Sequence, residues 1–268
     1  MKQNPILAAL SLALVAVSTP SALAADAAKP ATAGQTNADA ILKQMSDKLG
    51  AAQQFSFKAT REINAGAAAK QGLQAKAQIV VQVKRPNGAV ATSTSKDDVR
   101  TMYADGRNFT MLDGKENLYA TVPMRASLDA LPAQLAAKYG FVPPLADFVI
   151  SNPYKDMKFR AQTITYAGTA TYKTGFLGLT SVECYRLALT GSAADSELWI
   201  GVQDNLPRKM TATLKGANAG TTVNIEFQEW NLAASVADQA LTFTPPKGAV
   251  KIPMVTTAEA QTASKKQN

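Results

Sequence analysis

The amino-acid sequence predicts a mainly β protein of the α+β class, in which a single curved antiparallel sheet is accompanied by a few helices. Three observations support this fold class. Between positions 55 and 228, many apolar residues alternate with polar ones, as in strands that bury one face. Tight-turn dipeptides separate several of these runs. Helical spacing of apolar residues is confined to a few short segments.

The first 24 residues have the layout of a secretory signal peptide. Lys2 supplies a short positive region, residues 6–17 are apolar, and residues 22–24 form a small-x-small cleavage signal. The apolar run is too short to anchor the chain in a membrane. Because Ala25 rather than a cysteine follows the cleavage signal, no lipid attachment is expected. We therefore predict a soluble mature chain that is exported to the periplasm.

The mature chain is predicted to form one domain, residues 37–252, between two unstructured ends. Residues 25–36 are rich in Ala, Thr, Pro and Gly and indicate a flexible lead-in, and residues 253–268 indicate a disordered tail. Asn37 can cap a first helix that Gly50 would end. The apolar stripe of this helix consists of Ile41, Leu42, Met45 and Leu49.

A meander of strands is expected after the first helix. Phe55 and Phe57 alternate with polar residues, and residues 78–84 show the same period of two, although Val80 blurs the pattern. Hairpin turns are predicted from the dipeptides Asn87-Gly88, Asp105-Gly106 and Asp113-Gly114. These turns join neighbouring strands in antiparallel order.

Residues 127–150 interrupt the strands with a helical pattern. Apolar residues with helical spacing predict a helix over residues 131–139, with Pro132 in its first turn and Gly140 at its end. Pro143-Pro144 then precedes a short helix over residues 145–150. We predict that this pair of helices, joined by a proline-rich kink, forms a lid over the sheet.

Alternation resumes in the second half of the chain. Inward-facing residues are expected at Leu198 and Ile200, at Met210, and at Ile225 and Phe227. By the same alternation, Trp199 shares a face with Glu197, and Trp230 shares a face with Glu226 and Gln228. Both tryptophans are therefore predicted to lie outside the apolar face or at its rim.

The expected number of strands implies a curved sheet. About ten strands spaced roughly 4.8 Å apart would be about 48 Å wide if the sheet were flat. Three helices, each about 10 Å wide, cover roughly 30 Å. The sheet must therefore curl around its helices or leave apolar surface uncovered. A curled sheet under a thin lid can enclose an apolar cavity, but side chains can equally fill the concavity.

The composition argues against catalysis. The chain has no histidine, which removes Ser-His-Asp and Cys-His mechanisms and the commonest zinc ligand. Cys184, the single cysteine, lies in an apolar run and is expected to be a buried structural thiol. The net charge of +8 comes from dispersed residues, which favours an anionic membrane surface over nucleic acid as a partner. No enzymatic activity, metal or cofactor is expected.

Several short motifs resemble an exported protein family called domain of unknown function 2092, which is related to the lipoprotein carriers of the LolA and LolB fold. The motifs include Arg85-Pro86, Asp105-Gly106, residues 119–123, Tyr139-Gly140, residues 144–147, residues 182–184, residues 198–200, residues 207–209, residues 230–232 and residues 243–249. The resemblance implies a half-barrel whose concave apolar face is closed by helices and receives acyl chains. Family members often carry a histidine after the cysteine, where this chain has Tyr185 and Arg186.

The sequence and the resemblance together predict a monomeric binding or carrier protein for a lipid, a lipoprotein acyl chain or a similar amphiphile. An envelope-stress sensor or regulatory module that binds an envelope protein is the alternative. The predicted cavity and lid residues are Leu135, Phe141, Leu145, Phe148, Val149, Leu198, Ile200, Met210, Ile225 and Phe227.

Overall fold

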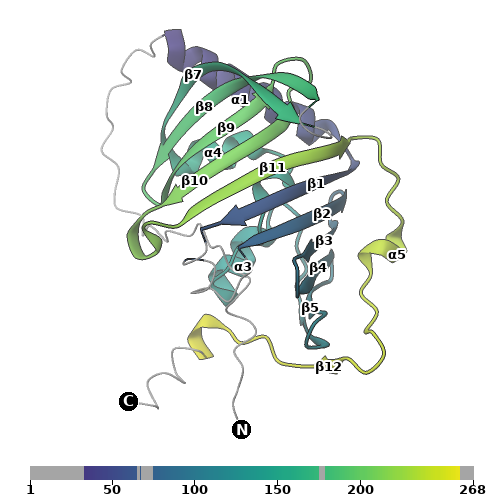
Figure 1. The fold of residues 1–268 in the computed structure, drawn as a ribbon. Coiled ribbons are helices and arrows are strands. Elements are labelled where there is room, and N and C mark those ends of the chain that lie inside the picture. The colour runs from purple at the N-terminus through teal and green to yellow at the C-terminus, as the bar shows by residue number, and fades with distance from the viewer. Residues whose placement is uncertain (1–32, 65–66, 68–74, 175–178, 260–268) are drawn as a thin grey trace.

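In the computed structural model, one twelve-stranded sheet curls around a small set of helices (Figure 1). The structure describes residues 33–64, 67, 75–174 and 179–259. The strands are ordered β12-β6-β5-β4-β3-β2-β1-β11-β10-β9-β8-β7, and all neighbours are antiparallel except β12 and β6. The predicted fold class is confirmed, with twelve strands in place of about ten.

The strands are β1 Gln54–Ile63, β2 Lys76–Lys84, β3 Gly88–Thr94, β4 Val99–Asp105, β5 Asn108–Asp113, β6 Leu118–Pro123, β7 Ala161–Thr174, β8 Thr180–Gly191, β9 Ala194–Gly201, β10 Pro207–Leu214, β11 Thr222–Asn231 and β12 Val250–Lys251. The helices are α1 Ala33–Ala51, α3 Leu131–Tyr139, α4 Pro153–Arg160 and α5 Asp238–Leu241, with 3-10 turns η1 Ala146–Phe148 and η3 Gly216–Asn218.

Helix α1 packs its predicted apolar stripe into the core. Leu42, Met45 and Leu49 are fully buried. The helix begins at Ala33, so the prediction that Asn37 caps it is wrong, because Asn37 lies inside the helix. Gly50 does not end the helix either. A Cβ atom at Gly50 would lie 2.5 Å from the carbonyl oxygen of Ser151, so this glycine allows α1 to approach the segment that follows the lid.

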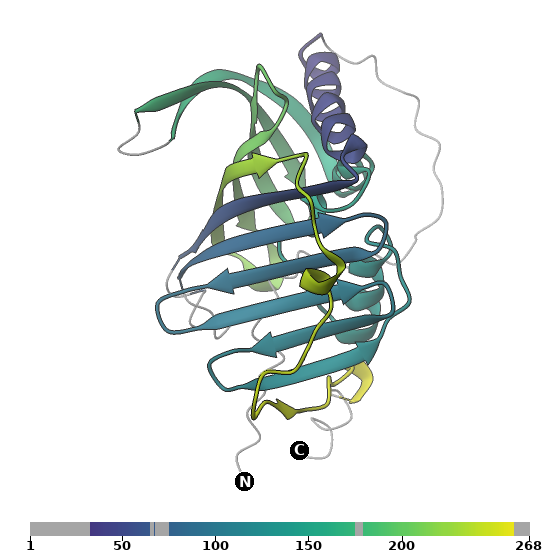
Figure 2. The same ribbon diagram turned by 90° about the vertical axis from the view of Figure 1, so that its right-hand side faces the viewer.

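The first half of the sheet is the predicted meander, which Figure 2 shows face-on. Phe55 and Phe57 are buried on the inner face together with Ile79, Val81 and Val83. Val80 points outward and is 41% exposed, so the alternation holds through β2. Gly106, in the predicted turn between β4 and β5, has a φ of 81°.

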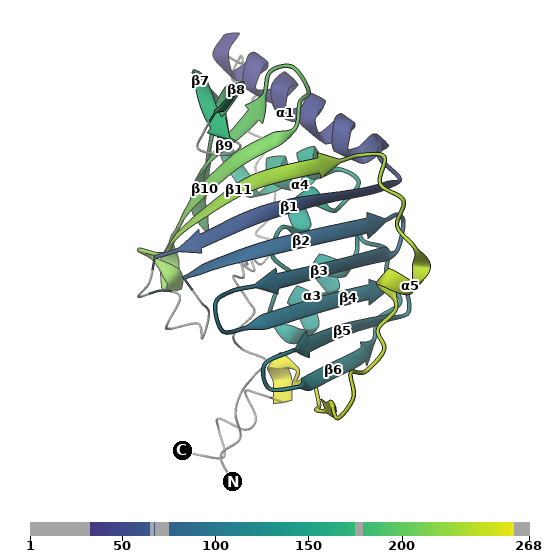
Figure 3. The ribbon, with the colours of Figure 1, turned by 45° about the vertical axis from the view of Figure 1, so that its right-hand side comes forward.

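The lid, residues 127–150, lies on the concave side of the sheet (Figure 3). Helix α3 covers the predicted residues, and Gly140 ends it in the left-handed conformation. The second helix is shorter than expected, because only Ala146–Phe148 form a 3-10 turn. Leu145 precedes this turn with a φ of 64°, a left-handed conformation that is costly for a residue with a Cβ atom.

Helix α4 and strand β7 are among the elements that were not predicted from the pattern of apolar residues. Helix α4 buries Pro153 and Met157 and packs Tyr154 against the core, and its other five residues are Lys155, Asp156, Lys158, Phe159 and Arg160, so it lacks a long apolar stripe. Strand β7 carries an irregularity between Tyr166 and Thr169, where Gly168 has a φ of 95°. This bulge interrupts the alternation by which a strand is recognised in sequence.

The two tryptophans differ in their agreement with the prediction. Trp199 lies on the outer face, where its ring nitrogen donates a 2.5 Å hydrogen bond to Glu197. The prediction for Trp230 is wrong. Its ring stacks on inward-facing Phe57, with 4.4 Å between ring centroids, and therefore lies on the inner face. The residue before it, Glu229, has a φ of 51°, and this local departure from extended backbone shifts Trp230 onto the inner face.

The C-terminal segment crosses the outer face of the first half of the sheet, as Figures 2 and 3 show. Phe243 packs between Tyr103 and Tyr119, at 5.4 Å and 5.0 Å between ring centroids. Strand β12 then pairs with the edge of β6. Met254, which was predicted to lie in a disordered tail, is buried in the core.

The predicted signal peptide, the lead-in up to residue 32 and residues 260–268 of the predicted tail lie outside the described residues. Residues 33–36 of the lead-in belong to α1. Among the helices that the structure describes, none is long and apolar enough to cross a membrane.

Candidate ligand-binding site

An apolar hollow lies between the inner face of strands β2 to β5 and the lid. Its walls are formed by Val81, Ala89, Ala91, Met102, Tyr103, Ala104, Phe109, Leu128, Leu131, Pro132, Pro143, Pro144, Ala146 and Val149. The volume of the cavity is about 50 Å³. Ligand pockets usually measure about 300–1,000 Å³, so the lid in this conformation leaves room for only a small part of a ligand.

Small side chains on the sheet create the hollow. Inward positions of neighbouring strands lie opposite one another, so Val81, Ala91 and Met102 form one cross-strand row. Ala89 and Ala104 form the adjacent row. Alanine at these positions leaves space that a leucine or phenylalanine would fill, because side chains normally pack protein interiors without gaps.

The next inward row of the same sheet is polar. Register places Ser93 opposite Arg100, and Arg100 opposite Asp113. The Arg100 Nε atom lies 2.8 Å from Asp98 and 3.7 Å from Asp113, and the three side chains are largely buried. Arg61 on β1 is also buried. This burial is the main cause that lowers the pKa of Arg61, and the neighbouring positive charge of Arg100 lowers it further. The apolar wall of the hollow is therefore continuous with a buried group of charges.

Arg85 fastens the end of the lid to the end of α1. Its guanidinium donates hydrogen bonds to four backbone carbonyl oxygens, those of Leu49, Ala52, Val149 and Ile150. The carbon atom of the guanidinium lies 4.8 Å from the centre of the Phe55 ring. Burial lowers the pKa of Arg85, and the carboxylate of Asp129 opposes this effect. A single side chain thus holds three segments of the chain together.

Two further contacts secure the lid. Asp129, just before α3, accepts 2.6 Å hydrogen bonds from both the backbone nitrogen and the hydroxyl of Ser151. Asp147 in η1 forms a 2.7 Å ion pair with Arg160 at the end of α4. The lid is therefore closed by polar contacts at its ends as well as by apolar packing.

The structure places the ten predicted site residues in or against one continuous core, but only one of them in the wall of the hollow. Val149 lines the hollow. Phe148 is brought against Phe227, at 4.6 Å between ring centroids, and Phe141 packs against Phe109 at 5.8 Å. The remaining members pack within or against the core: Leu135, Leu145, Leu198, Ile200, Met210 and Ile225. As ligand contacts, these residues remain predictions.

The hollow lies against strands β2 to β5, whereas the predicted site residues of the sheet lie on β9, β10 and β11. None of its wall residues on the sheet is among the predicted site residues. The signal that could have found them is the run of alanines at inward positions of two adjacent strands, Ala89, Ala91 and Ala104. Large inward residues fill a concavity, whereas small ones leave it open.

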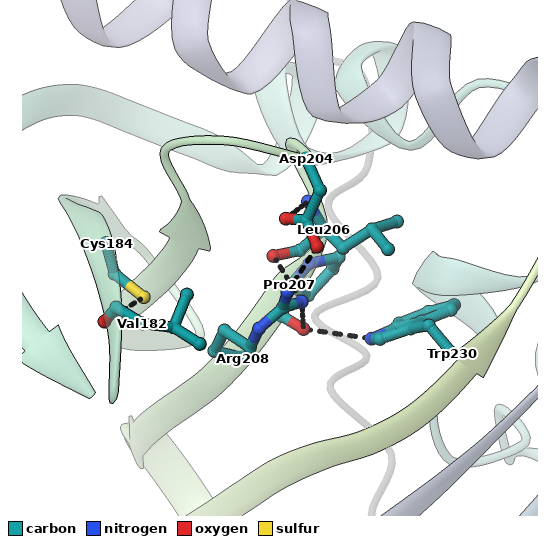
Figure 4. A network of polar contacts seen from close by, with 7 residues as sticks. All are labelled: Val182, Cys184, Asp204, Leu206, Pro207, Arg208 and Trp230. Carbon is teal, nitrogen blue, oxygen red and sulfur yellow. Dashed lines mark hydrogen bonds and ion pairs between the residues drawn. The ribbon is translucent and has the colours of Figure 1, made fainter. Parts of the chain in front are cut away.

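Cys184 belongs to a different part of the molecule (Figure 4). It is fully buried, as predicted, and pairs with Gly201 on β9. Nearby, Arg208 forms an ion pair with Asp204 and donates to the carbonyl oxygen of Leu206. Burial raises the pKa of the Cys184 thiol to about 11, so the thiol is protonated and a poor nucleophile at neutral pH.

The described part of the chain contains no group of side chains that suits a metal ion. No three or more His, Cys, Asp or Glu side chains there are arranged to hold one. The arrangement that the structure does provide is an apolar hollow, a neighbouring polar row and a closed lid.

Several solved structures are similar to this chain at low sequence identity. One is an uncharacterized conserved protein from Thermus thermophilus, with 10% identity, 81% of this chain and 99% of that chain covered, and a TM-score of 0.44. Another is the LolA superfamily protein NE2245 from Nitrosomonas europaea, with 13% identity, coverages of 77% and 97%, and a TM-score of 0.36. A third is the Pseudomonas aeruginosa MucA/MucB complex, with 15% identity, coverages of 78% and 61%, and a TM-score of 0.36.

No curated protein matches the chain. A family model does match, and it covers residues 38–255, which include all strands of the sheet. The chain belongs to the DUF2092 family, which is described as predicted periplasmic protein.

Proposed function

We propose that this protein is a periplasmic binding or carrier protein that holds the apolar part of an amphiphile, such as a lipid or a lipoprotein acyl chain, between the sheet and the lid. The observation that carries the proposal is the apolar hollow beneath the lid. The buried polar row that contains Arg100 lies next to it on the same face and provides a place for a polar headgroup. This combination suits an amphiphile better than a purely apolar molecule.

Binding requires the lid to move. The cavity of about 50 Å³ is much smaller than an acyl chain needs, so a chain enters only as the lid lifts from β3 and β4. Burial of each CH₂ group contributes about 0.8 kcal/mol, and a long chain can therefore offset the loss of a few lid contacts. Opening of the lid is thus the step that admits the ligand.

The material that the protein carries in its native host tests the proposal. Protein exported by the host and purified without detergent is expected to contain an amphiphile at close to one molecule per chain, detected by lipid mass spectrometry. Delipidated protein mixed with host membranes provides the control, because it should take up the same compound. A ligand-free protein that instead captures one defined envelope protein would contradict the carrier function and support a sensor.

A further inference from the structure

The polar row beside the hollow contains buried atoms that lack a hydrogen-bond partner. Nε of Arg100 lies 2.8 Å from Oδ2 of Asp98, and the two side chains are only 16% and 14% exposed. Within the described part of the chain, neither Nη1 of Arg100 nor Oδ1 of Asp98 has a hydrogen-bond partner, although both atoms are buried. Buried polar atoms are nearly always hydrogen-bonded, because leaving one unsatisfied is costly. One donor and one acceptor therefore remain to be satisfied at this place.

The charges of this cluster balance one another. Arg61 and Arg100 are positive, and Asp98 and Asp113 are negative. Asp113 lies 3.7 Å from Nε of Arg100. Burial and the neighbouring charge of Arg100 lower the pKa of Arg61, and the carboxylate of Asp98 opposes them. A carboxylate or phosphate that entered the cluster would add an unmatched charge away from water, which is unfavourable. The cluster therefore suits an uncharged polar group.

The cluster lies at one end of the hollow. Arg100 is two residues from Met102 on the inner face of β4, and its partner Ser93 is two residues from Ala91 on β3. Met102 and Ala91 line the hollow. Two residues of a strand span about 6.6 Å, so a headgroup on a chain in the hollow can reach the cluster. Arg85 follows the other end of β2 and fastens the lid there. The headgroup would therefore point away from Arg85.

We propose that Asp98 and Arg100 bind the uncharged, hydroxyl-bearing headgroup of an acylglycerol, an inference that rests on the carrier function proposed above and narrows its ligand class. A hydroxyl group both donates and accepts hydrogen bonds. One hydroxyl of the glycerol donates to Oδ1 of Asp98, and a glycerol oxygen accepts from Nη1 of Arg100. An ionised fatty acid has acceptors only, so it leaves Oδ1 of Asp98 without a donor and adds a negative charge.

Displacement of a fluorescent fatty acid from the delipidated mature chain measures this preference. Monolauroylglycerol, methyl laurate and laurate carry the same twelve-carbon acyl chain, and each is used below the concentration at which it aggregates. Methyl laurate lacks a donor, and laurate is charged. Monolauroylglycerol is expected to displace the probe at about tenfold lower concentration than either of the others, because only it satisfies both buried atoms.

Asp98→Asn removes one negative charge with little change in side-chain size. The cluster then has a net positive charge, so the affinity for laurate relative to monolauroylglycerol should rise about tenfold. Asp97→Asn is the matched control, because Asp97 is exposed and lies beside Asp98 between β3 and β4. Its preference should equal that of the wild type. Asp113→Asn changes the net charge by the same amount and should shift the preference in the same direction, so the test does not depend on the folding of one variant.

The outcomes separate this inference from the carrier function. Saturable binding of all three compounds with equal affinity to the wild type would overturn the inference and leave the carrier function intact. If neither the probe nor any of the three compounds binds, both are wrong. A preference that stays unchanged in both Asp98→Asn and Asp113→Asn would show that the cluster does not contact the headgroup.

Discussion

Replacing Arg85 with methionine is expected to lower the free energy of unfolding by about 3 kcal/mol or more. Methionine keeps an apolar stem against Phe55 but provides no donor for the carbonyl oxygens of Leu49, Ala52, Val149 and Ile150. Hydrogen bonds from a charged donor contribute about 1.5–3 kcal/mol each, although the four are not additive because they share one side chain. Urea denaturation measures the loss.

The matched control for Arg85 is Arg125→Met, since Arg125 is exposed between β6 and the lid. Its free energy of unfolding should change by less than about 0.5 kcal/mol. Hydrogen exchange gives a second readout, because residues 145–151 should lose protection in Arg85→Met before the sheet does. If Arg85→Met unfolds at the same urea concentration as Arg125→Met, Arg85 does not fasten the lid.

Replacing Phe148 with alanine is the second change with a large expected effect. Phe148 is 1% exposed and meets Phe227 edge-on, next to the stack of Phe57 and Trp230. Truncation of a buried phenylalanine to alanine typically lowers stability by about 3–5 kcal/mol. Because the ring anchors the lid to the sheet, the variant should also bind a fluorescent fatty acid faster in stopped-flow mixing.

Phe159→Ala supplies a direct comparison for Phe148→Ala. It makes the same chemical change 11 positions later in the chain, at a side chain that is 91% exposed. Its stability and its rate of fatty-acid binding should match those of the wild type. A loss of stability in Phe148→Ala without any change in the binding rate would show that this ring supports the core but does not control the lid.

Much of the sheet can be predicted from this sequence because its inner face follows simple alternation. Ile79, Val81 and Val83 are recognisable as the buried face of one strand, and Val80, which points outward, does not change this prediction. The lid helix α3 is equally clear, because Gly140 ends a run of apolar residues with helical spacing. In these segments local pattern and final packing agree.

The errors arise where the backbone departs from a regular element or where few residues face the core. Glu229 has a positive φ, and this places Trp230 on the inner face. The bulge at Gly168 interrupts the alternation of apolar and polar residues in β7, so this strand was not predicted. Helix α4 is mostly polar, yet its start has a recognisable signal. The side chain of Asn152 accepts a hydrogen bond from the backbone nitrogen of Lys155, and Pro153 occupies the first turn.

The location of the hollow could not be obtained from large apolar residues. Phe227 and Ile200 face inward as predicted, but their side chains are packed in the core beside β9 and β11. The open space lies instead over the alanines of β3 and β4, beneath the proline-rich kink of the lid. A cavity depends on the volume left between elements, and alternation alone gives the inward positions but not that volume, which also depends on the size of the inward side chains such as Ala89, Ala91 and Ala104.

Titration with a fluorescent sixteen-carbon fatty acid, applied to delipidated wild type, Ala91→Phe and Val80→Phe, tests the central claim most directly. Ala91 lines the hollow, whereas Val80 lies on the outer face of the neighbouring strand, so only Ala91→Phe fills the proposed site. We expect saturable binding to the wild type and to Val80→Phe, and at least a tenfold weaker affinity in Ala91→Phe with its fold retained. Equal affinity of the two variants, or no binding to the wild type, would contradict the account.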